Sequence, residues 1–538
     1  MSELSGKSII GFRRGEPNVD SFRAVNPLSG EELTPEYYAA SEAEVDQAVQ
    51  LASRAFEVYR QTSPKLKAAF LRKIAENIEG LGEPLVTRAT DETALPPVRI
   101  RNETARTCNQ LRLFAELIEE GSWVDARIDR GDPMRQPLAK PDVRSMLRPL
   151  GPVVVFCASN FPLAFSVAGG DTASALAAGN PVVVKAHRAH PGTAELVGLA
   201  VSDALRTSDL PEGVFSLLFG RGEDIGMQLV RHPQIKAGGF TGSRSGGQAL
   251  MHAAAARPEP IPFYAEMSSV NPIFLFPDAL REREEQIAIG LHASVTLGAG
   301  QFCTNPGLVF LPTGADSAGL IERLKEMMAS TAAFTMLTSR ISTAYHEGTE
   351  ALLRNGAVET LVQPDVDRSS CYCGVGAGLF RTCVDSFLAD TNLSAEVFGP
   401  ATLLVTYSDV EQLPDIARKL EGQLTATIHA TDAEQDGVNK LIDVIENKAG
   451  RIVFNGFPTG VEVCHSMVHG GPFPATSDGR STSVGTRAAL RFVRPFCYQD
   501  VPAIALPDEL KDGNPLNIWR MVDGELNKAA LSDMTFGC

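Results

Sequence analysis

The sequence lacks any apolar run long enough to cross a membrane, which takes about 18 consecutive residues. Its first residues, MSELSGKSIIGFRRGEPN, also lack the long apolar segment of a secretory signal peptide. Only nine cysteines occur in 538 residues, and their spacing is irregular, which argues against a disulfide framework and favours a reducing compartment. We therefore expect a cytoplasmic protein without a membrane partner.

Positive charge is also scarce, because 49 Lys and Arg stand against 65 Asp and Glu, for a formal net charge of −16. This balance argues against a general nucleic-acid-binding surface, while a local basic site remains compatible with it. What is present is typical of a well-packed soluble enzyme, with 44% hydrophobic and 21% charged residues. At roughly 100–200 residues per domain, the length indicates two to four domains.

Helical spacing of apolar residues predicts helices within residues 41–79 and, after Pro96 and Pro97, over residues 98–119. The segment VNPLSGEEL predicts an exposed hairpin. Further on, short apolar runs such as VVVFCAS and PVVVKAH alternate with helical stretches, and a second alternating block extends from Asn271 to about Gly470. Such alternation predicts two α/β domains with parallel sheets covered on both faces.

Two residues suggest covalent chemistry. Cys303, in the polar loop GAGQFCTNPG, is a candidate nucleophile, with a structural cysteine as the alternative. Glu266 ends a strand-like run and is a candidate general base whose pKa partial burial would raise, with a salt-bridged surface glutamate as the alternative.

Other candidates lie where predicted strands end. The loop GGFTGSRSGG, with Gly242 and Gly247, offers backbone amides at a helix N-terminus, which suit a pyrophosphate or form a plain tight turn. Lys185 and Asn160 each end an apolar run, and in an open α/β sheet such positions face the ligand crevice. Either residue could instead cap a turn.

The order of these signals is more specific than any one of them. The segments FCASNFPLAF, AAGNPVVVKAH, GGFTGSRSGG, AEMSSVNP, GQFCTNPG and EVFGPATLLV together resemble the aldehyde dehydrogenase superfamily, from about Val25 to Asp500. Longer segments, such as FNGFPTGVEVCHSMVHGGPFPATSDGRSTSVGT, look closest to its α-ketoglutaric semialdehyde (2,5-dioxopentanoate) dehydrogenases. That subgroup is related to NADP-linked fatty aldehyde dehydrogenases.

The resemblance implies catalytic roles for four residues. Cys303 matches the nucleophile that forms a thioester, Asn160 the side-chain donor of the oxyanion hole, and Glu266 the base that activates water. His465 matches a histidine near the nucleophile in the NADP-linked relatives, where it would assist proton transfer or serve only a structural role.

The resemblance also implies an NAD(P) site. Lys185 matches the lysine at the adenosine ribose, Gly242 and Ser243 the turn at the pyrophosphate, and Glu396 and Phe398 the pair at the nicotinamide ribose and ring.

A charge difference bears on the choice of cofactor. Arg188 replaces a glutamate that NAD-preferring members often carry, and a guanidinium can pair with a 2′-phosphate. We therefore predict NADP, with NAD as an open alternative and Arg221 as a second contact; the alternative is that Arg188 points to solvent.

Two departures from the family pattern bear on the site. The usual tryptophan two residues before Asn160 is Ala158, and the usual Glu-Leu-Gly-Gly continues after Glu266 with Met267, Ser268 and Ser269. Serines in place of these two glycines would narrow the space along the backbone near the base.

The resemblance favours a carboxylated aldehyde as substrate, which would need a cation such as Arg106 or Arg112. A broad aliphatic or fatty aldehyde dehydrogenase and a non-catalytic member of the fold remain the alternatives. The lone pair Cys371 and Cys373 lacks the second ligand pair of a zinc site, so we predict no metal.

The family architecture implies a Rossmann-type cofactor domain, an α/β catalytic domain and a small strand element for homodimers or homotetramers. The predicted divisions are the cofactor domain at 1–131 and 152–265, the catalytic domain at 266–475, the oligomerisation element at 132–151 and 490–505, and a C-terminal tail at 506–538. The tail would pack through Trp519 and Met521 or remain mobile.

Overall fold

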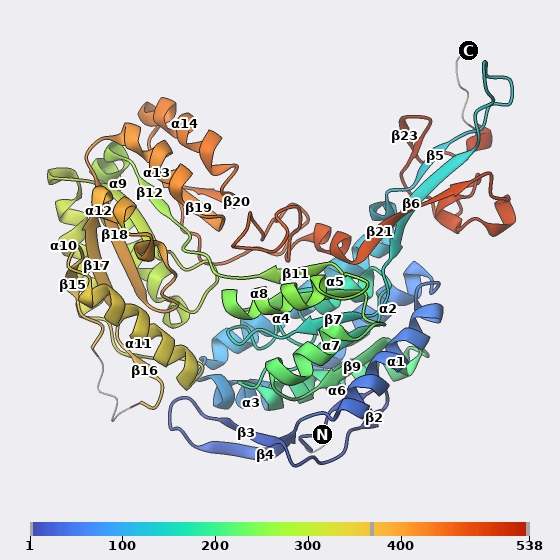
Figure 1. Ribbon diagram of the computed structural model, residues 1–538, viewed down its shortest axis with the longest axis horizontal. Helices are drawn as coiled ribbons and strands as arrows, with labels where there is room; N and C mark the ends of the chain where they lie inside the picture. The colour runs from blue at the N-terminus through green and yellow to red at the C-terminus, as the bar shows by residue number, and fades with distance from the viewer. Residues whose placement is uncertain (1–3, 366–370, 534–538) are drawn as a thin grey trace.

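The computed structural model describes residues 4–365 and 371–533. Figure 1 shows two bodies of helices and strands side by side and a narrow strand arm that projects from one of them. Two sheets have seven strands each, and the arm contains a sheet of five. The last residues of the predicted tail, 534–538, lie outside the described part of the chain.

The first sheet has the order β11-β10-β7-β8-β9-β1-β2. Its parallel strands are β7 (Val153–Phe156), β8 (Val182–Lys185), β9 (Phe215–Leu218), β10 (Ala237–Thr241) and β11 (Phe263–Glu266). The antiparallel edge is β1 (Ile9–Ile10) and β2 (Arg13–Arg14). The chain runs one way from β7 to β9 and the other way from β10 to β11. The crevice of this doubly wound sheet therefore lies at the carboxyl ends of β7 and β10.

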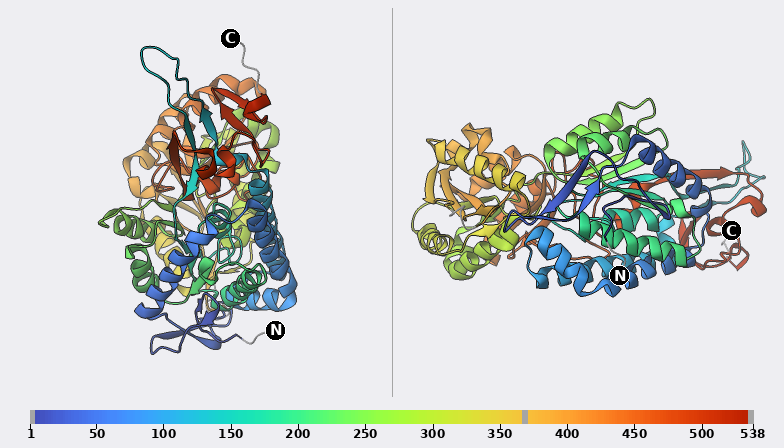
Figure 2. Two further views of the ribbon diagram at one scale, coloured as in Figure 1. Left: turned by 90° about the vertical axis from the view of Figure 1, so that its right-hand side faces the viewer. Right: turned by 90° about the horizontal axis from the view of Figure 1, so that it is seen from below.

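Helices cover this sheet, as the apolar strand runs predict (Figure 2). Those after β7 are α5 (Gly170–Ala177), α6 (Pro191–Thr207), α7 (Met227–Arg231) and α8 (Arg244–Ala255). Those before it are α1 (Glu42–Tyr59), α2 (Pro64–Leu81), α3 (Glu83–Thr93) and α4 (Pro97–Glu120). Residues 41–79 form two helices, because Ser63 caps α2 and Pro64 begins it. The predicted helix over 98–119 is confirmed as α4.

The second sheet has the order β15-β17-β18-β13-β12-β19-β20, and only β15 is antiparallel. The strands are β12 (Ile273–Leu275), β13 (Leu308–Pro312), β15 (Glu359–Val362), β17 (Gly378–Cys383), β18 (Ala401–Tyr407), β19 (Gln423–His429) and β20 (Ala449–Phe454). The helices are α9 (Pro277–Thr296), α10 (Ala315–Ala329), α11 (Ser339–Arg354), α12 (Val384–Ala389), α13 (Leu413–Lys419) and α14 (Gln435–Ile445). The expectation of two parallel α/β sheets is confirmed.

Two small strand pairs complete these bodies. The predicted hairpin is β3 (Ser21–Val25) with β4 (Glu32–Tyr38), and β14 (Phe334–Thr335) pairs with β16 (Gly374–Val375).

The third sheet forms the projecting arm in Figure 1, with the order β21-β6-β5-β22-β23. Its strands are β5 (Arg127–Asp129), β6 (Val143–Pro149), β21 (Val493–Gln499), β22 (Arg520–Val522) and β23 (Glu525–Asn527). Two of them come from the predicted tail. This segment is held by buried Leu510, Ile518 and Val522, whereas Trp519 is 45% exposed.

No helix in the described part of the chain is both long and apolar enough to span a membrane.

Candidate active site

Cys303 lies in a tightly shaped loop between the two large sheets. The loop follows α9 and a short 3-10 turn over Leu297–Gly300. Gly300 has φ +67°, and a Cβ there would meet the carbonyl of Gly399 at 2.2 Å, so only glycine fits. The thiol is half-buried and forms no disulfide.

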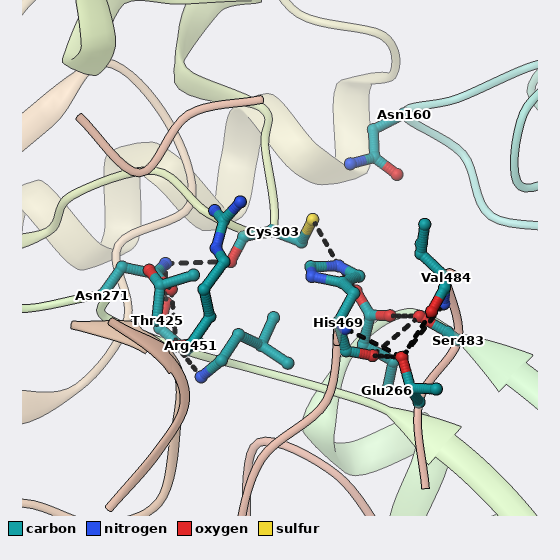
Figure 3. A network of polar contacts seen from close by, with 12 residues as sticks. Asn160, Glu266, Asn271, Cys303, Thr425, Arg451, His469, Ser483 and Val484 are labelled. Carbon is teal, nitrogen blue, oxygen red and sulfur yellow. Dashed lines mark hydrogen bonds and ion pairs between the residues drawn. The ribbon is translucent and has the colours of Figure 1, made fainter. Parts of the chain in front are cut away.

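His469 is the side chain beside this thiol (Figure 3). Its Nε2 lies 3.4 Å from Cys303 Sγ and 2.8 Å from Glu266 Oε1, and the imidazole is buried. The expectation that His465 lies at the nucleophile is wrong, because His465 is exposed four residues earlier. The segment EVCHSMVHGG contains two histidines and shows no helical or strand periodicity. The sequence pattern therefore cannot predict which histidine faces the thiol, and only the folded chain shows it.

Glu266 ends β11 and is buried. Its Oε1 faces His469, and its Oε2 accepts a hydrogen bond of 2.7 Å from Ser483 Oγ. Burial raises the pKa of Glu266, but the charge and hydrogen bond of His469, with that of Ser483, outweigh burial and lower it. The expected upward shift is therefore wrong in direction, and Glu266 is poised as a carboxylate.

The thiol of Cys303 shows the opposite behaviour. Burial and then the charge of Glu266 raise its pKa well above the ordinary value, while Arg106 acts in the opposite sense. At neutral pH the sulfur therefore carries its proton in this state. The Nε2 of His469 beside it donates to Glu266, so the Glu266 carboxylate, a hydrogen-bond partner of the thiol, is the acceptor within reach.

Two asparagines surround the loop of Cys303. Asn160, after β7, donates from Nδ2 to the Gln301 carbonyl at 3.0 Å, and its side chain points toward the thiol in Figure 3. Asn271 is fully buried and donates from Nδ2 to the carbonyls of Cys303 and Asn305, both at 2.9 Å. Sequence reasoning missed Asn271, although it stands five residues after Glu266 in the quoted segment AEMSSVNP. It fixes the backbone that carries the nucleophile.

Glu266, Cys303 and His469 together are the one cluster of potential metal ligands among the described residues, with ligand atoms within 4.8 Å of one another. A thiol, an imidazole and a carboxylate suit a zinc ion. The same three atoms are the reactive groups of the site, so a metal there would block the nucleophile.

The predicted pyrophosphate turn lies at the crevice of the first sheet. Ser243 caps α8, accepting from the Gly246 amide at 3.3 Å, and Gly242 donates its amide to the Glu266 carbonyl at 3.1 Å. Lys185 ends β8, and burial, together with the charge of Arg188, lowers its pKa to about 8 against the opposing effect of Cys157.

Arg188 and Arg221 form a cationic pair at the same edge. Both are exposed, and Arg188 lies over the Phe22 ring, 4.5 Å from its centroid. Burial and then the charge of Arg221 lower the pKa of Arg188. Within the described residues neither guanidinium has a carboxylate partner within ion-pair distance. These arginines, the N-terminus of α8 and Lys185 place positive charge at the carboxyl edge of the first sheet, which suits a dinucleotide.

Glu396 and Phe398 lie half-buried in the loop that packs on the Cys303 loop. Burial raises the pKa of Glu396 to about 7, against hydrogen bonds from the Ser268 side chain and the Ser269 amide. The Ser269 hydroxyl itself donates to Gln423 Oε1 at 2.9 Å. The two serines in place of glycine thus anchor the segment after Glu266.

The two candidate substrate-binding arginines of α4 lie in different places. Arg112 forms an ion pair with Glu79 at 2.6 Å near the surface, so its predicted position at the substrate is wrong. The guanidinium of Arg106 lies over the rings of Phe161 and Phe165, beside the Cys303 loop.

The two α/β bodies carry a thiol, an imidazole and a carboxylate in contact, an arrangement that suits thiol-dependent catalysis. Comparison with known proteins gives the family. Residues 14–473 match the model of the aldehyde dehydrogenase family. The chain belongs to this family, as the sequence resemblance predicts, and is an aldehyde dehydrogenase.

Two relatives align over nearly their whole length. The chain is 48% identical to alpha-ketoglutaric semialdehyde dehydrogenase 2 of Azospirillum brasilense, over 97% of this chain and 99% of that protein. It is 45% identical to alpha-ketoglutaric semialdehyde dehydrogenase of Acinetobacter baylyi, over 98% and 100%.

Solved structures share the fold at lower identity. Lactaldehyde dehydrogenase from Escherichia coli superposes with a TM-score of 0.79 at 19% identity, over 92% of this chain and 98% of that one. Betaine aldehyde dehydrogenase from Staphylococcus aureus, solved in complex with NAD⁺, gives 0.78 at 19%, over 93% and 96%. The predicted α/β aldehyde dehydrogenase fold is confirmed.

Proposed function

We propose that this protein oxidises α-ketoglutaric semialdehyde to 2-oxoglutarate with NADP. The observation that carries the proposal is the near-complete alignment with two enzymes of that name. It is supported by the arrangement of a thiol, an imidazole and a carboxylate in contact, with an arginine beside them.

The residues divide the reaction between them. Glu266 takes the proton of Cys303 and passes it to solvent, and the sulfur attacks the aldehyde carbon. His469 holds the carboxylate in place through its Nε2–H. Asn160 Nδ2, which here donates to the Gln301 carbonyl, is close enough to turn to the resulting alkoxide together with the Cys303 amide. A dinucleotide held in the crevice of the first sheet would supply the hydride acceptor, and the loss of hydride from carbon leaves a thioester on Sγ.

Glu266 completes the cycle. Its carboxylate accepts a proton from water, the hydroxide adds to the thioester carbon, and the Sγ–C bond breaks to release the carboxylic acid. The lowered pKa of Glu266 suits this task, because the group must be ionised when the water arrives.

An aliphatic or fatty aldehyde is the second candidate substrate, favoured by the aromatic rings of Phe161, Phe165 and Phe302 beside the nucleophile. Wild-type kcat/KM for α-ketoglutaric semialdehyde is expected to exceed that for pentanal by at least about 10-fold, since one charged hydrogen-bonded contact contributes on that scale. NADPH formation with each aldehyde measures this ratio. A higher value for pentanal or hexanal would assign the second candidate.

Selection of NADP rests on Arg188 and Arg221. Arg188→Glu is expected to lower the NADP-to-NAD ratio of kcat/KM by about 10²-fold, because a guanidinium–phosphate pair is replaced by like-charge repulsion. Initial rates with both dinucleotides measure it. Arg231→Glu on α7 makes the same charge change at another exposed arginine and serves as the control. An unchanged ratio in Arg188→Glu contradicts the assignment.

We place the enzyme in the cytoplasm as a homodimer or homotetramer, with no resident metal and no nucleic-acid or membrane partner. The exposed β21 edge of the projecting sheet supports an interface between copies.

A further inference from the structure

Arg106 occupies an unusual position beside the nucleophile. Its guanidinium carbon lies 5.4 Å from the ring centroid of Phe165 and 5.8 Å from that of Phe161. These rings follow Asn160 and form one apolar cluster with Phe302, the residue before Cys303. The charge of Arg106 acts on Cys303, and the charges of Cys303 and Glu266 act on Arg106. The guanidinium therefore packs on the aromatic rings next to the Cys303 loop, near enough to the reacting groups for their charges to act on it.

This cation has no polar partner in the described part of the chain. Its Nε is buried without a hydrogen bond, and no ion pair or hydrogen bond of Arg106 occurs within residues 4–365 and 371–533. The neighbouring Glu103 is engaged elsewhere, because it pairs with Arg99 and accepts from the amides of Leu163 and Ala164. A half-buried guanidinium without a counter-ion is costly unless an anion arrives from outside the chain.

The other cation near Cys303 is less suited to receive an anion. Arg451 already donates from Nη2 to the Pro458 carbonyl at 2.7 Å and from Nη1 to the Gly460 carbonyl at 3.2 Å. The terminal nitrogens of Arg106 have no such partners. The planar fork of a guanidinium matches a carboxylate with two parallel hydrogen bonds.

We propose that Arg106 binds the carboxylate end of the substrate while the aldehyde carbon lies at Cys303 Sγ. In α-ketoglutaric semialdehyde three carbons separate the two groups, and its methylenes would lie along Phe161 and Phe165. The inference rests on the proposed function and names the residue that selects acidic aldehydes over neutral ones of the same length.

The test compares two aldehydes of five carbons. Arg106→Met keeps the length of the side chain and removes its charge, and it is expected to lower kcat/KM for α-ketoglutaric semialdehyde by about 10- to 100-fold. Turnover of pentanal should change by less than about threefold, mainly through KM. Arg106→Lys should restore part of the preference, since it returns a point charge without the fork.

Arg112→Met is the matched control, because it removes a guanidinium from the same helix where that group pairs with Glu79. Arg112→Met should leave kcat/KM for both aldehydes unchanged. An equal fall for both aldehydes in Arg106→Met and Arg106→Lys, or no fall, overturns the inference. If wild type itself lacks a preference for the acidic aldehyde, the proposed function fails; if wild type has it and Arg106→Met retains it, only the role of Arg106 fails.

Discussion

Cys303→Ala is expected to lower kcat/KM for aldehyde oxidation by at least about 10⁴-fold, because no other described side chain at the site can form the thioester. Cys303 is the thiol in contact with His469, and its loop is fixed from behind by Asn271. NADPH formation measures the loss. Cys383→Ala is the control, since Cys383 is exposed on β17 in the second sheet and should be fully dispensable. Retention of more than about 1% of wild-type activity would contradict the role of Cys303.

The same two cysteines are expected to differ in the pH at which alkylation levels off. Only the thiolate reacts with iodoacetamide, and burial and Glu266 raise the pKa of Cys303, so its labelling rate should still climb above pH 9. A hydrogen bond with Ser386 lowers the pKa of Cys383, so its labelling should level off at lower pH. Peptide mass spectrometry separates the two sites. Aldehyde substrate should protect Cys303 alone.

The fold could be predicted from the sequence where the local patterns are strong. The runs VVVF and VVVK are fully buried in β7 and β8, because strands covered on both faces need continuous apolar residues. The strands β22 and β23 of the tail are three residues long each and carry no alternation, so only their pairing with β5 defines them.

From the sequence, only the site residues that lie in recognisable motifs could be predicted. Cys303 and Glu266 stand in recognisable segments, whereas His469 reaches them across 166 and 203 residues of chain. The downward pKa shift of Glu266 depends on that contact and on Ser483, 217 residues away, so no local pattern contains it.

The sequence also did not predict which of the two arginines of α4 lies near the nucleophile. Arg112 lies six positions after Arg106, which places them about 120° apart around a helix. Both arginines could bind a carboxylate. Which of them reaches the site depends on how the helix is rotated against the core, and this rotation directs Arg112 to Glu79.

Glu266→Gln is expected to form about one NADPH per active site in the first turnover and then to slow by about 10²- to 10⁴-fold. The amide fills the same space and still contacts Ser483, but it cannot take a proton from water. Without the carboxylate, Nε2 of His469 need not carry the hydrogen that it donates to Glu266, so it can accept the thiol proton, and the thioester forms and accumulates. Stopped-flow absorbance measures the burst, and the mass of the Cys303 peptide identifies the acyl group.

Ser483→Ala tests whether the Glu266 carboxylate itself, rather than its hydrogen-bond partner Ser483, is needed for hydrolysis of the thioester. It removes the hydrogen bond to Oε2 but leaves Glu266 ionisable, so kcat should fall by no more than about 10-fold. Because that hydrogen bond lowers the pKa of Glu266, its loss raises this pKa, and the acid limb of the kcat profile should move to higher pH. A slow Glu266→Gln enzyme without a burst would mean that Glu266 is required before hydride transfer, to take the thiol proton. A burst together with the shifted limb in Ser483→Ala assigns Glu266 to the hydrolysis of the thioester.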